Sequence, residues 1–475
     1  MTMEEVKPET AQAAEPVKAS ESNIEENADA DAATNIEENK NKTEESEEAL
    51  KVANKAVAVA VAVESSFLSD LKDAEKKALA ELKAKLEEAI VENKLFKKED
   101  PKPPKENQAE TKAEVQEEAD KVVEQQISLW GVPLSPRSKD SAAAAAADVL
   151  LLKFLRAREF KVKEAFDMLK NTLQWRRDNK IDSVLEETEL GDDFGAACYM
   201  EGLDREGHPV CYNVVSAVFR EEEVYKKAFG SKEGRERFLR WRVQLMEKGI
   251  QKLDMRPGGI SKLLQITDLK DSVGPSKKEL RDTMKQALQL LQDNYPEFVT
   301  RNIFINVPFW YYAFYALLSP FMTQRTKNKF VVTRSSNVTE TLLKHIPAEA
   351  IPIQYGGFKR ENDTVFSLED DPVSELIVKA SSTETIEIAA PKGGTTAVWD
   401  LSVLGWEVKY KEEFVPSDEG SYTIILQKVK KMGSQEEELL IRNSFMNNEP
   451  GKVVLTVENN TSKKKKVLFR YKTDQ

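Results

Sequence analysis

Few side chains in this sequence have the type and the spacing that catalysis or metal binding requires. The two histidines, His208 and His345, fall in different expected elements, and no further metal ligands stand at a suitable spacing from either. The sequence also lacks glycine-rich phosphate loops, the serine-hydrolase elbow and the paired cysteines of zinc sites. We therefore expect no enzyme, no cofactor and no metal, although a pair of carboxylates, which leaves no local pattern, would still permit catalysis.

The two cysteines, Cys198 and Cys211, flank an expected hairpin whose turn is Arg205-Glu206-Gly207. The hairpin would make the two thiols near neighbours. We favour the interpretation that they are small buried side chains, since a free cysteine packs as a small apolar residue. So few cysteines fit a reducing compartment and no disulfide scaffold.

An aromatic segment is the most informative part of the chain. Seven of the 37 aromatic residues fall within 309–321, between Pro308, which suits the first turn of a helix, and Pro320, which ends one. The rings cannot all lie on one helix face. Such a helix is either wholly buried or borders a cavity or a membrane, and periodicity alone favours the buried core helix.

The formal net charge of −12 belongs to one end of the chain. The first 50 residues hold 15 acidic residues and four lysines, so the remaining residues are close to neutral. This balance argues against nucleic acid as a partner, because nucleic-acid binding leaves a basic footprint. No apolar run reaches the ~20 residues that span a bilayer, and we expect no secretory signal. The expected location is the cytoplasm.

The N-terminal part divides into three segments. Residues 1–66 contain no aromatic residue and are expected to form an acidic disordered tail. Residues 67–96 carry leucines at spacings of three, four and seven, which predicts an amphipathic helix with Ser69 as its N-cap. That helix would pair with a partner or with itself, or pack loosely on its own chain, and the sequence favours neither. Residues 97–128 are expected to be a charged linker.

Three ordered regions follow. Residues 129–185 predict a small helical subdomain. Residues 186–360 alternate strands with helices, with buried strands expected at 262–269 and 302–307, which predicts a mostly parallel sheet. Residues 371–475 hold seven or eight short alternating runs, which predict an antiparallel β-sandwich.

Five motifs, in order along the chain, resemble the CRAL-TRIO, or Sec14-like, lipid-transfer family. The last 105 residues resemble a GOLD domain, and an acidic tail, a Sec14-like module and a GOLD domain together are the layout of plant patellins. The resemblance implies a multidomain fold: an α/β Sec14-like domain with an N-terminal helical subdomain, then an all-β GOLD sandwich. The matching motifs are LLKFLRAREFKV at 151–162, QITDL at 265–269, NYPE at 294–297, IFINVP at 303–308 and LLKHIPAEAIPIQYGG at 342–357.

The family encloses one phospholipid in an apolar cavity that a mobile helical gate closes, and the aromatic segment matches that gate. Each buried CH₂ group is worth ~0.8 kcal/mol, so a carrier must keep the acyl chains out of water until it meets a membrane. Large rings suit a gate because they cover the cavity when it is shut and enter the membrane interface when it is open. The resemblance thus assigns gate and cavity roles to Phe309, Trp310, Tyr312, Phe314, Tyr315, Phe321 and Met322.

The resemblance also assigns four residues to the headgroup of a bound phosphoinositide. Lys329 would balance phosphate charge, Thr326 would donate to a phosphate oxygen, and Glu297 would accept from inositol hydroxyls or orient the lysine. Arg158 would hold the helical subdomain onto that region. One departure is Phe298, where the family commonly has a basic residue. The alternative for each charged residue is a surface ion pair, which contributes little.

Four consecutive lysines near the C-terminus, Lys463, Lys464, Lys465 and Lys466, have two interpretations of equal weight. They could touch an anionic membrane, which attracts each lysine near its surface by ~1 kcal/mol. They could instead protect an edge strand from pairing with other chains.

These expectations combine into one leading hypothesis. The protein would be a peripheral membrane protein that binds phosphoinositides, exchanges or senses lipid, and contacts trafficking proteins through its GOLD domain or its N-terminal helix. By resemblance to the patellins it would act at the plasma membrane or the cell plate, in vesicle trafficking and cytokinesis. The alternative is a scaffold that binds protein partners without exchanging lipid, with the aromatic helix as solid core.

Overall fold

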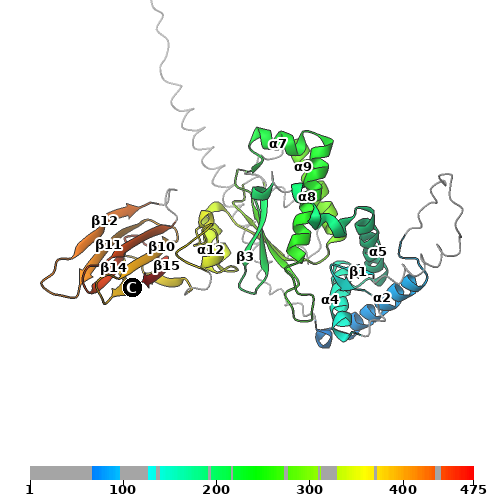
Figure 1. The fold of residues 1–475 in the computed structure, drawn as a ribbon, viewed down its shortest axis with the longest axis horizontal. Helices are drawn as coiled ribbons and strands as arrows, with labels where there is room; N and C mark the ends of the chain where they lie inside the picture. Colours follow the sequence, from blue (N-terminus) through cyan, green and yellow to red (C-terminus); the bar gives the residue numbers. More distant parts are fainter. Residues whose placement is uncertain are drawn as a thin grey trace, which may run out of the picture. The chain divides into compact units, whose positions relative to one another are not determined.

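A computed structural model of the 475-residue chain describes residues 67–96, 127–134, 140–190, 194–214, 218–271, 277–308, 311, 329–367, 372–433 and 440–474. The expected tail at 1–66 lies outside the described residues, and so does the expected linker at 97–128 except for its end. The described residues form a helical bundle, a central sheet with its helices, and a C-terminal sandwich (Figure 1).

The bundle consists of three helices, α2 (Asp73–Val91), α4 (Ser141–Ala157) and α5 (Val162–Asp178). Leu82 and Leu86 of α2 are completely buried, in one core with Leu155 of α4 and Leu169 of α5. The helix expected as a separate segment is therefore part of the bundle, and its leucine stripe packs on its own chain. The reason lies in α4, which is apolar on most sides and needs neighbours on more than one of them.

The start of α2 differs from the expected one. Ser69 does not cap it, because Ser69 lies in a 3₁₀ turn (Leu68–Asp70) that precedes the helix. The N-cap of α2 is Lys72, whose backbone N–H donates to the Glu75 carboxylate at 3.0 Å. A carboxylate in the first turn of a helix therefore takes the role expected of the serine hydroxyl.

The central sheet has five strands in the order β3-β4-β5-β6-β7. β3 pairs antiparallel with β4 through the expected hairpin, and β4 to β7 run parallel, which confirms the mostly parallel sheet. Because the parallel strands follow chain order across the sheet, right-handed crossovers place their helices on one face. The strands are β3 (Cys198–Leu203), β4 (Pro209–Asn213), β5 (Leu263–Asp268), β6 (Val299–Ile305) and β7 (Phe330–Val332), and the helices are α7 (Glu222–Phe229), α8 (Lys232–Ile250) and α9 (Lys278–Asn294) (Figure 1).

The two faces of the sheet have different surroundings. Cys211 of β4 faces α8 and α9, whereas the next residue, Tyr212, points the other way. Tyr212 and Ile266 belong to a core completed by α12 (Val338–Leu343) and by the segment 346–358. The chain that follows β7 therefore covers one face of the sheet, and α8 and α9 pack on the other.

A buried polar cluster fixes the bundle to the loop before β6. The guanidinium of Arg176, in α5, donates to Oε1 of Glu247, in α8, at 2.5 Å, and the Tyr295 hydroxyl donates to the same oxygen at 2.6 Å. Burial and the charge of Glu247 raise the pKa of Tyr295, which keeps its hydroxyl a donor. Trp130, in the small hairpin of β1 (Ser128–Leu129) and β2 (Val132–Pro133), adds a further hydrogen bond to Glu247 at 3.3 Å.

The C-terminal region is a β-sandwich, as the sequence predicts. Its two four-stranded antiparallel sheets have the orders β13-β10-β15-β8 and β12-β11-β14-β9. Trp399, Tyr410 and Phe414 are buried between them. The strands are β8 (Ser374–Val378), β9 (Ser382–Ala390), β10 (Thr396–Val403), β11 (Val408–Pro416), β12 (Ile424–Met432), β13 (Ile441–Met446), β14 (Gly451–Asn459) and β15 (Lys465–Asp474).

A row of charges crosses three neighbouring strands of the sandwich and holds the segment before it. Asp400 of β10 is completely buried and stands opposite Arg442 of β13 and Arg470 of β15. Arg442 forms a two-point contact with Asp400, with both distances 2.7 Å, and a second one with Asp363 at 2.7 and 2.8 Å. Arg470 donates to Asp400 at 2.8 Å and to the carbonyl of Phe358 at 3.0 Å. We call these four charged residues the sandwich cluster.

Candidate functional site

Two of the residues assigned to the headgroup meet in the structure. Lys329 Nζ lies 2.8 Å from Glu297 Oε2, although 32 positions separate them in the sequence. Glu297 lies in the turn between α9 and β6, with a left-handed backbone (φ +57°). Lys329 directly precedes β7, and its carbonyl accepts from the N–H of Asn302 in β6 at 2.8 Å. Pairing of β6 with β7 therefore fixes the lysine beside the glutamate.

A third residue, Lys153, completes this corner. It lies in α4 and is 1 % exposed, and its ammonium group donates to the carbonyls of Ser261 at 2.7 Å and Glu297 at 3.1 Å. The Phe298 ring lies 4.4 Å from the same nitrogen. Our sequence reasoning missed Lys153, whose one signal is its position inside the apolar run Leu151-Leu152-Lys153-Phe154-Leu155. We call Lys153, Glu297 and Lys329 the lysine corner.

The lysine corner contains two lysines and one carboxylate. Burial lowers the pKa of Lys153 well below its usual range, and the nearby charges of Lys262 and Lys329 lower it further, while Glu297 opposes them. The side chain of Glu297 is buried at 7 % exposure, but that of Lys329 is 20 % exposed. The buried carboxylate of Glu297 thus lies near several lysines, and of these Lys329 is accessible to solvent. Such an arrangement suits a group that carries several negative charges, such as a phosphate ester.

The other two residues assigned to the headgroup are not joined to this corner by a described contact. Arg158 is the C-cap of α4 and donates to the carbonyl of Ala157 at 3.3 Å. No ion pair joins Arg158 to Glu297 in the part of the chain that the structure describes. Thr326 lies outside the described residues.

The residues assigned to the gate also fall outside the described residues: Phe309, Trp310, Tyr312, Phe314, Tyr315, Phe321 and Met322. Their role stays a prediction. One ring of the same segment is described: Tyr311 is buried, and its ring centroid lies 5.4 Å from that of Phe304 in β6.

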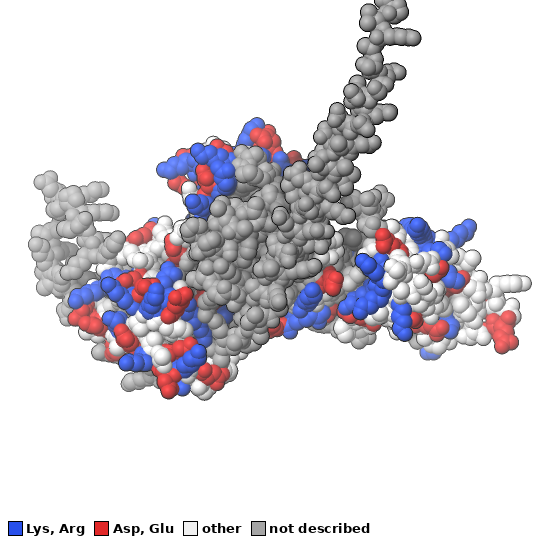
Figure 2. Space-filling model, turned by 180° about the vertical axis from the view of Figure 1, so that it is seen from behind, with Lys and Arg blue, Asp and Glu red and all other residues white. Residues whose placement is uncertain are grey.

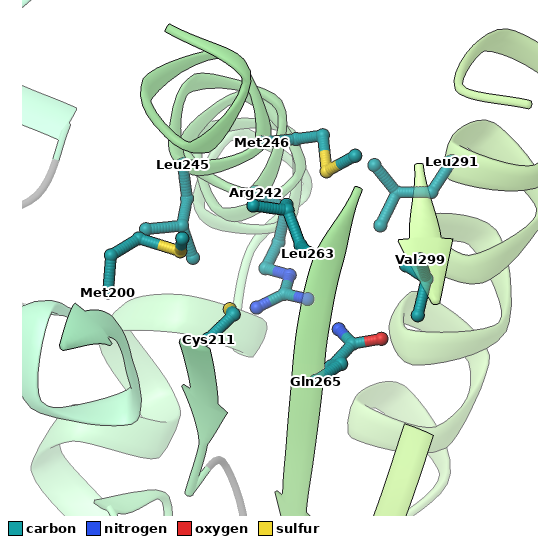
Figure 3. A pocket seen from close by; sticks show the side chains of 9 residues that line it. All are labelled: Met200, Cys211, Arg242, Leu245, Met246, Leu263, Gln265, Leu291 and Val299. Atoms are coloured by element: carbon teal, nitrogen blue, oxygen red, sulfur yellow. The ribbon is translucent and has the colours of Figure 1, made fainter. Parts of the chain in front are cut away.

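A small cavity lies between the sheet and its helices, on the face toward α8 and α9 (Figure 3). Its volume is about 30 Å³, room for a water-sized molecule or two and too little for an acyl chain. Apart from one arginine and one glutamine, its walls are apolar or carry sulfur. The lining residues are Met200, Cys211, Arg242, Leu245, Met246, Leu263, Gln265, Leu291 and Val299.

The four C-terminal lysines differ in their surroundings. Lys463 and Lys464 are exposed. Lys465 begins β15 and is buried, with its ammonium group 3.3 Å from Glu407. Lys466 pairs with Glu375 on the neighbouring strand at 2.8 Å. Contact with a membrane stays a prediction for this run, but Lys465 is turned into the protein, so it could not take part without leaving its ion pair.

The remaining candidate chemistry is sparse. His208 bonds Asp204 within the hairpin at 2.9 Å, and burial together with the charge of Arg301 lowers the pKa of His345 to about 4. Among the described residues, no group of acids, histidines and cysteines could hold a metal ion.

No helix in the described ranges has the length and apolarity to cross a bilayer. Basic and acidic side chains are mixed over the visible described surface (Figure 2).

Three family models match the chain, one for each region. The model of the CRAL/TRIO domain matches residues 193–357, and that of the CRAL/TRIO N-terminal domain matches residues 78–171. The latter range includes most of α2, in agreement with its place in the bundle. A model described as the Patellin-1-like C-terminal GOLD domain matches residues 379–465.

Known proteins resemble the chain over most of its length. Patellin-4 of Arabidopsis thaliana is 50% identical over 86% of this chain and 88% of its own length. Patellin-3 of the same plant is 46% identical over 86% of this chain and 76% of its own length. A phosphatidylinositol transfer protein of Kluyveromyces lactis, SFH5, is 29% identical over 52% of this chain and 80% of its own length. The crystal structure of Sfh5 covers 57% of this chain and 84% of its own, at 23% identity and a TM-score of 0.43.

Proposed function

Because this chain belongs to the patellin family, we propose that it binds a phospholipid in its CRAL/TRIO domain and carries or presents that lipid at membranes without catalysing a reaction. Family membership rests on 50% identity to Patellin-4 across most of both chains. The match of residues 193–357 to the CRAL/TRIO family supports the lipid-binding role of this region. The bound lipid is a ligand and not a cofactor.

The proposed ligand is a phosphoinositide. The observation that carries this choice is the lysine corner, where Lys329 is exposed on one side and anchored to buried Glu297 on the other. A phosphate placed there would take over the charge of Lys329, and the freed carboxylate of Glu297 could accept from inositol hydroxyls. SFH5 of Kluyveromyces lactis, which shares the CRAL/TRIO part, is a phosphatidylinositol transfer protein by name.

The remaining roles complete this proposal. Thr326 would donate to the phosphate, and the segment 309–322 would act as the gate that covers the acyl chains. Arg158, at the end of α4, would hold the bundle onto the corner.

We place the action of the protein at the cytoplasmic surface of membranes, at the plasma membrane or the cell plate, in vesicle trafficking and cytokinesis. Resemblance to the plant patellins supports this location. Trafficking proteins would bind to the GOLD domain, because the apolar stripe of α2 is occupied within the bundle. A fluorescent fusion that stays away from dividing membranes in plant cells would contradict the location and leave lipid binding untouched.

Native mass spectrometry of the full chain from a eukaryotic host tests the core of the proposal. We expect the protein to carry one phospholipid per chain, because acyl chains exposed to water are costly. An empty protein that also fails to take up phospholipid from vesicles would contradict the proposal and favour a scaffold.

The substitution Lys329→Ala tests the headgroup site. We expect binding to phosphatidylcholine vesicles that contain a phosphoinositide to weaken about tenfold, as expected when one charged hydrogen bond is lost. The melting temperature should change little, because Lys329 is partly exposed. Flotation with the vesicles measures binding.

Lys344→Ala is the matched control, since Lys344 is an exposed lysine of the same domain. Equal binding by wild type and Lys329→Ala, or equal losses in both variants, would discard the headgroup site.

A further inference from the structure

A pair of buried thiols lies beside the small cavity and has no part in the proposed lipid site. Cys198 is the first residue of β3, and Cys211 lies in β4. The strand register pairs Cys198 with Asn213 and Met200 with Cys211, so the two cysteines are diagonal neighbours on one face of the sheet. Their sulfur atoms are 3.6 Å apart. The described structure holds both as free thiols.

An arginine is directed at this pair without an acidic partner. Arg242 of α8 donates from Nη1 to the side-chain oxygen of Asn213 at 2.9 Å, and the Sγ of Cys198 bonds the same oxygen at 2.9 Å. Figure 3 shows the guanidinium beside Cys211, pointing toward the strands. Within the described ranges, no carboxylate forms an ion pair with Arg242. A thiolate is therefore the negative charge that this arginine can balance.

The surroundings of the two thiols favour the loss of one proton from the pair. Burial raises the pKa of Cys198, but the hydrogen bond from Cys211 and the charge of Arg242 lower it, and the net result is a pKa of about 7. The same hydrogen bond and burial raise the pKa of Cys211. One negative charge is thus shared across the two sulfur atoms, and thiolates, not thiols, react with oxidants.

The cavity determines which oxidant can arrive. Cys211 and Arg242 both line it, and its volume of about 30 Å³ admits a molecule about the size of one or two waters. Hydrogen peroxide meets that limit, whereas a peptide thiol such as glutathione does not. We propose that Cys198 and Cys211 form a modification site at which hydrogen peroxide oxidises the two thiols to a reversible disulfide.

The chemistry balances in two steps. The proton of Cys211 first passes to Cys198 along the hydrogen bond between them, so that Cys211, which lines the cavity, becomes the thiolate. The Cys211 thiolate attacks one oxygen of hydrogen peroxide, the O–O bond breaks, and a sulfenic acid and a hydroxide form; the hydroxide takes the proton from Cys198. The Cys198 thiolate then attacks the Cys211 sulfur and displaces its hydroxyl group, which leaves as water after taking up a proton. In total, two thiols and one peroxide give one disulfide and two waters. The sulfur atoms, now 3.6 Å apart, must approach to about 2.05 Å.

Exposure of the full chain to hydrogen peroxide at neutral pH tests this proposal. We expect intact mass spectrometry to show the loss of two hydrogen atoms, and dithiothreitol to restore the starting mass. Peptide mapping without reduction should find Cys198 joined to Cys211. Protein that keeps both thiols while Met200 or Met246 of the cavity wall becomes a sulfoxide would overturn the proposal, since peroxide would then have reached the cavity without reacting with the pair.

Two variants give independent readouts. In Cys198→Ser, Cys211 should stop at the sulfenic acid, which dimedone traps, because no second thiol is present to displace the hydroxyl. Arg242→Met should slow disulfide formation by about tenfold or more, because a thiolate without a neighbouring cation forms less readily, and Arg242→Lys should recover part of the rate. An Arg242→Met variant that folds, by circular dichroism, and reacts as fast as wild type would contradict the role of the arginine.

Discussion

The lysine corner and the sandwich cluster both hold buried charge, but they hold it differently. In the sandwich cluster, Asp400 is completely enclosed and each of its oxygens is taken up by an arginine. In the lysine corner, Lys153 bonds backbone carbonyls instead of a carboxylate, and Lys329 keeps one side open. In the first arrangement, arginines surround both carboxylates inside the protein, with Arg360 3.8 Å from Asp400 as a further cation. In the second, Lys329 is held by a single carboxylate and has an open side, where an anion could bind.

Geometry explains why the two differ. The three strands of the sandwich bring Arg442, Asp400 and Arg470 into one row, where cross-strand neighbours face each other directly. Lys153, Glu297 and Lys329 come instead from a helix, a turn and a strand start. A buried group with a strongly shifted pKa, such as Lys153, is common at functional sites.

The largest effect should follow from the substitution Asp400→Asn. It removes the charge of the completely buried carboxylate that Arg442 and Arg470 share, and leaves them Asp363 alone. Breaking a buried ion pair costs ~3–5 kcal/mol. Urea unfolding measures this loss in free energy. Vesicle binding, counted per folded molecule, should not change, and a loss below ~1 kcal/mol would show that the two arginines do not depend on this carboxylate.

Glu387→Gln is a suitable control for that experiment. Glu387 pairs with Lys452 on the same sandwich at 2.7 Å, but both side chains are largely exposed. An exposed pair contributes ~0–1 kcal/mol, so the control should unfold close to wild type. Similar losses in both variants would remove the distinction between buried and exposed charge in this domain.

Compared with Asp400→Asn, the substitution Lys153→Met should reduce stability less and should weaken vesicle binding more. Methionine keeps the length of the side chain and its apolar packing, but the carbonyls of Ser261 and Glu297 lose a donor. Unsatisfied buried acceptors cost ~1–3 kcal/mol, partly offset because the buried amine is gone. We expect phosphoinositide binding to fall about as far as in Lys329→Ala, since Glu297 is no longer fixed. Binding equal to that of wild type would show that Lys153 has a packing role alone.

The smallest effect should be a dependence of stability on alkaline pH. The folded state lowers the pKa of Lys153 below its value in the unfolded chain, so the unfolded chain binds more protons between the two values. Stability should therefore rise as the pH increases toward ~10, with a slope below the ~1.4 kcal/mol per pH unit of a single proton. Urea unfolding between pH 7 and 10 measures the slope, which Lys153→Met should reduce; the lowered pKa of Cys198 contributes a rise of its own at the lower end of this range.

The sandwich cluster should respond at the opposite end of the pH scale. Hydrogen bonds from Arg442 lower the pKa of Asp363, against the effect of burial. Its contribution is therefore present above the unfolded pKa of ~4 and is lost as the pH falls below it. In Lys153→Met, the loss of stability at acidic pH should stay as in wild type, and the rise of stability at alkaline pH should be reduced. A variant that behaves otherwise would contradict the link between Lys153 and the alkaline effect.

Much of the fold follows from local patterns in the sequence. The hairpin around Arg205-Glu206-Gly207 forms as expected, and the apolar run at 262–269 becomes β5 within one residue at either end. Helix α8 starts where Ser231 accepts from the N–H of Gly234 at 3.0 Å, a cap that the sequence displays. These features depend on neighbours in the chain, so a single sequence contains their cause.

Contacts between residues far apart in the chain could not be predicted from the sequence. Lys153 bonds carbonyls 108 and 144 positions away, and no property of LLKFL indicates either of them. The sequence did not place α2 in the bundle for the same reason. An apolar stripe indicates that the helix packs against something, but it does not identify the partner. Glu297 and Lys329 could be assigned together through the resemblance to a known family, and not through spacing.

The order of the strands also has a consequence for how the protein is made. During synthesis, β4, β5 and β6 leave the ribosome well before α12 and the segment 346–358, which cover Tyr212 and Ile266. Leu468, near the end of the chain, belongs to the same core. That apolar face of the nascent sheet is exposed to water until residues up to 358 have been made, and its cover is complete only when Leu468 arrives. We therefore expect chaperones that bind exposed apolar surface to assist the chain during elongation.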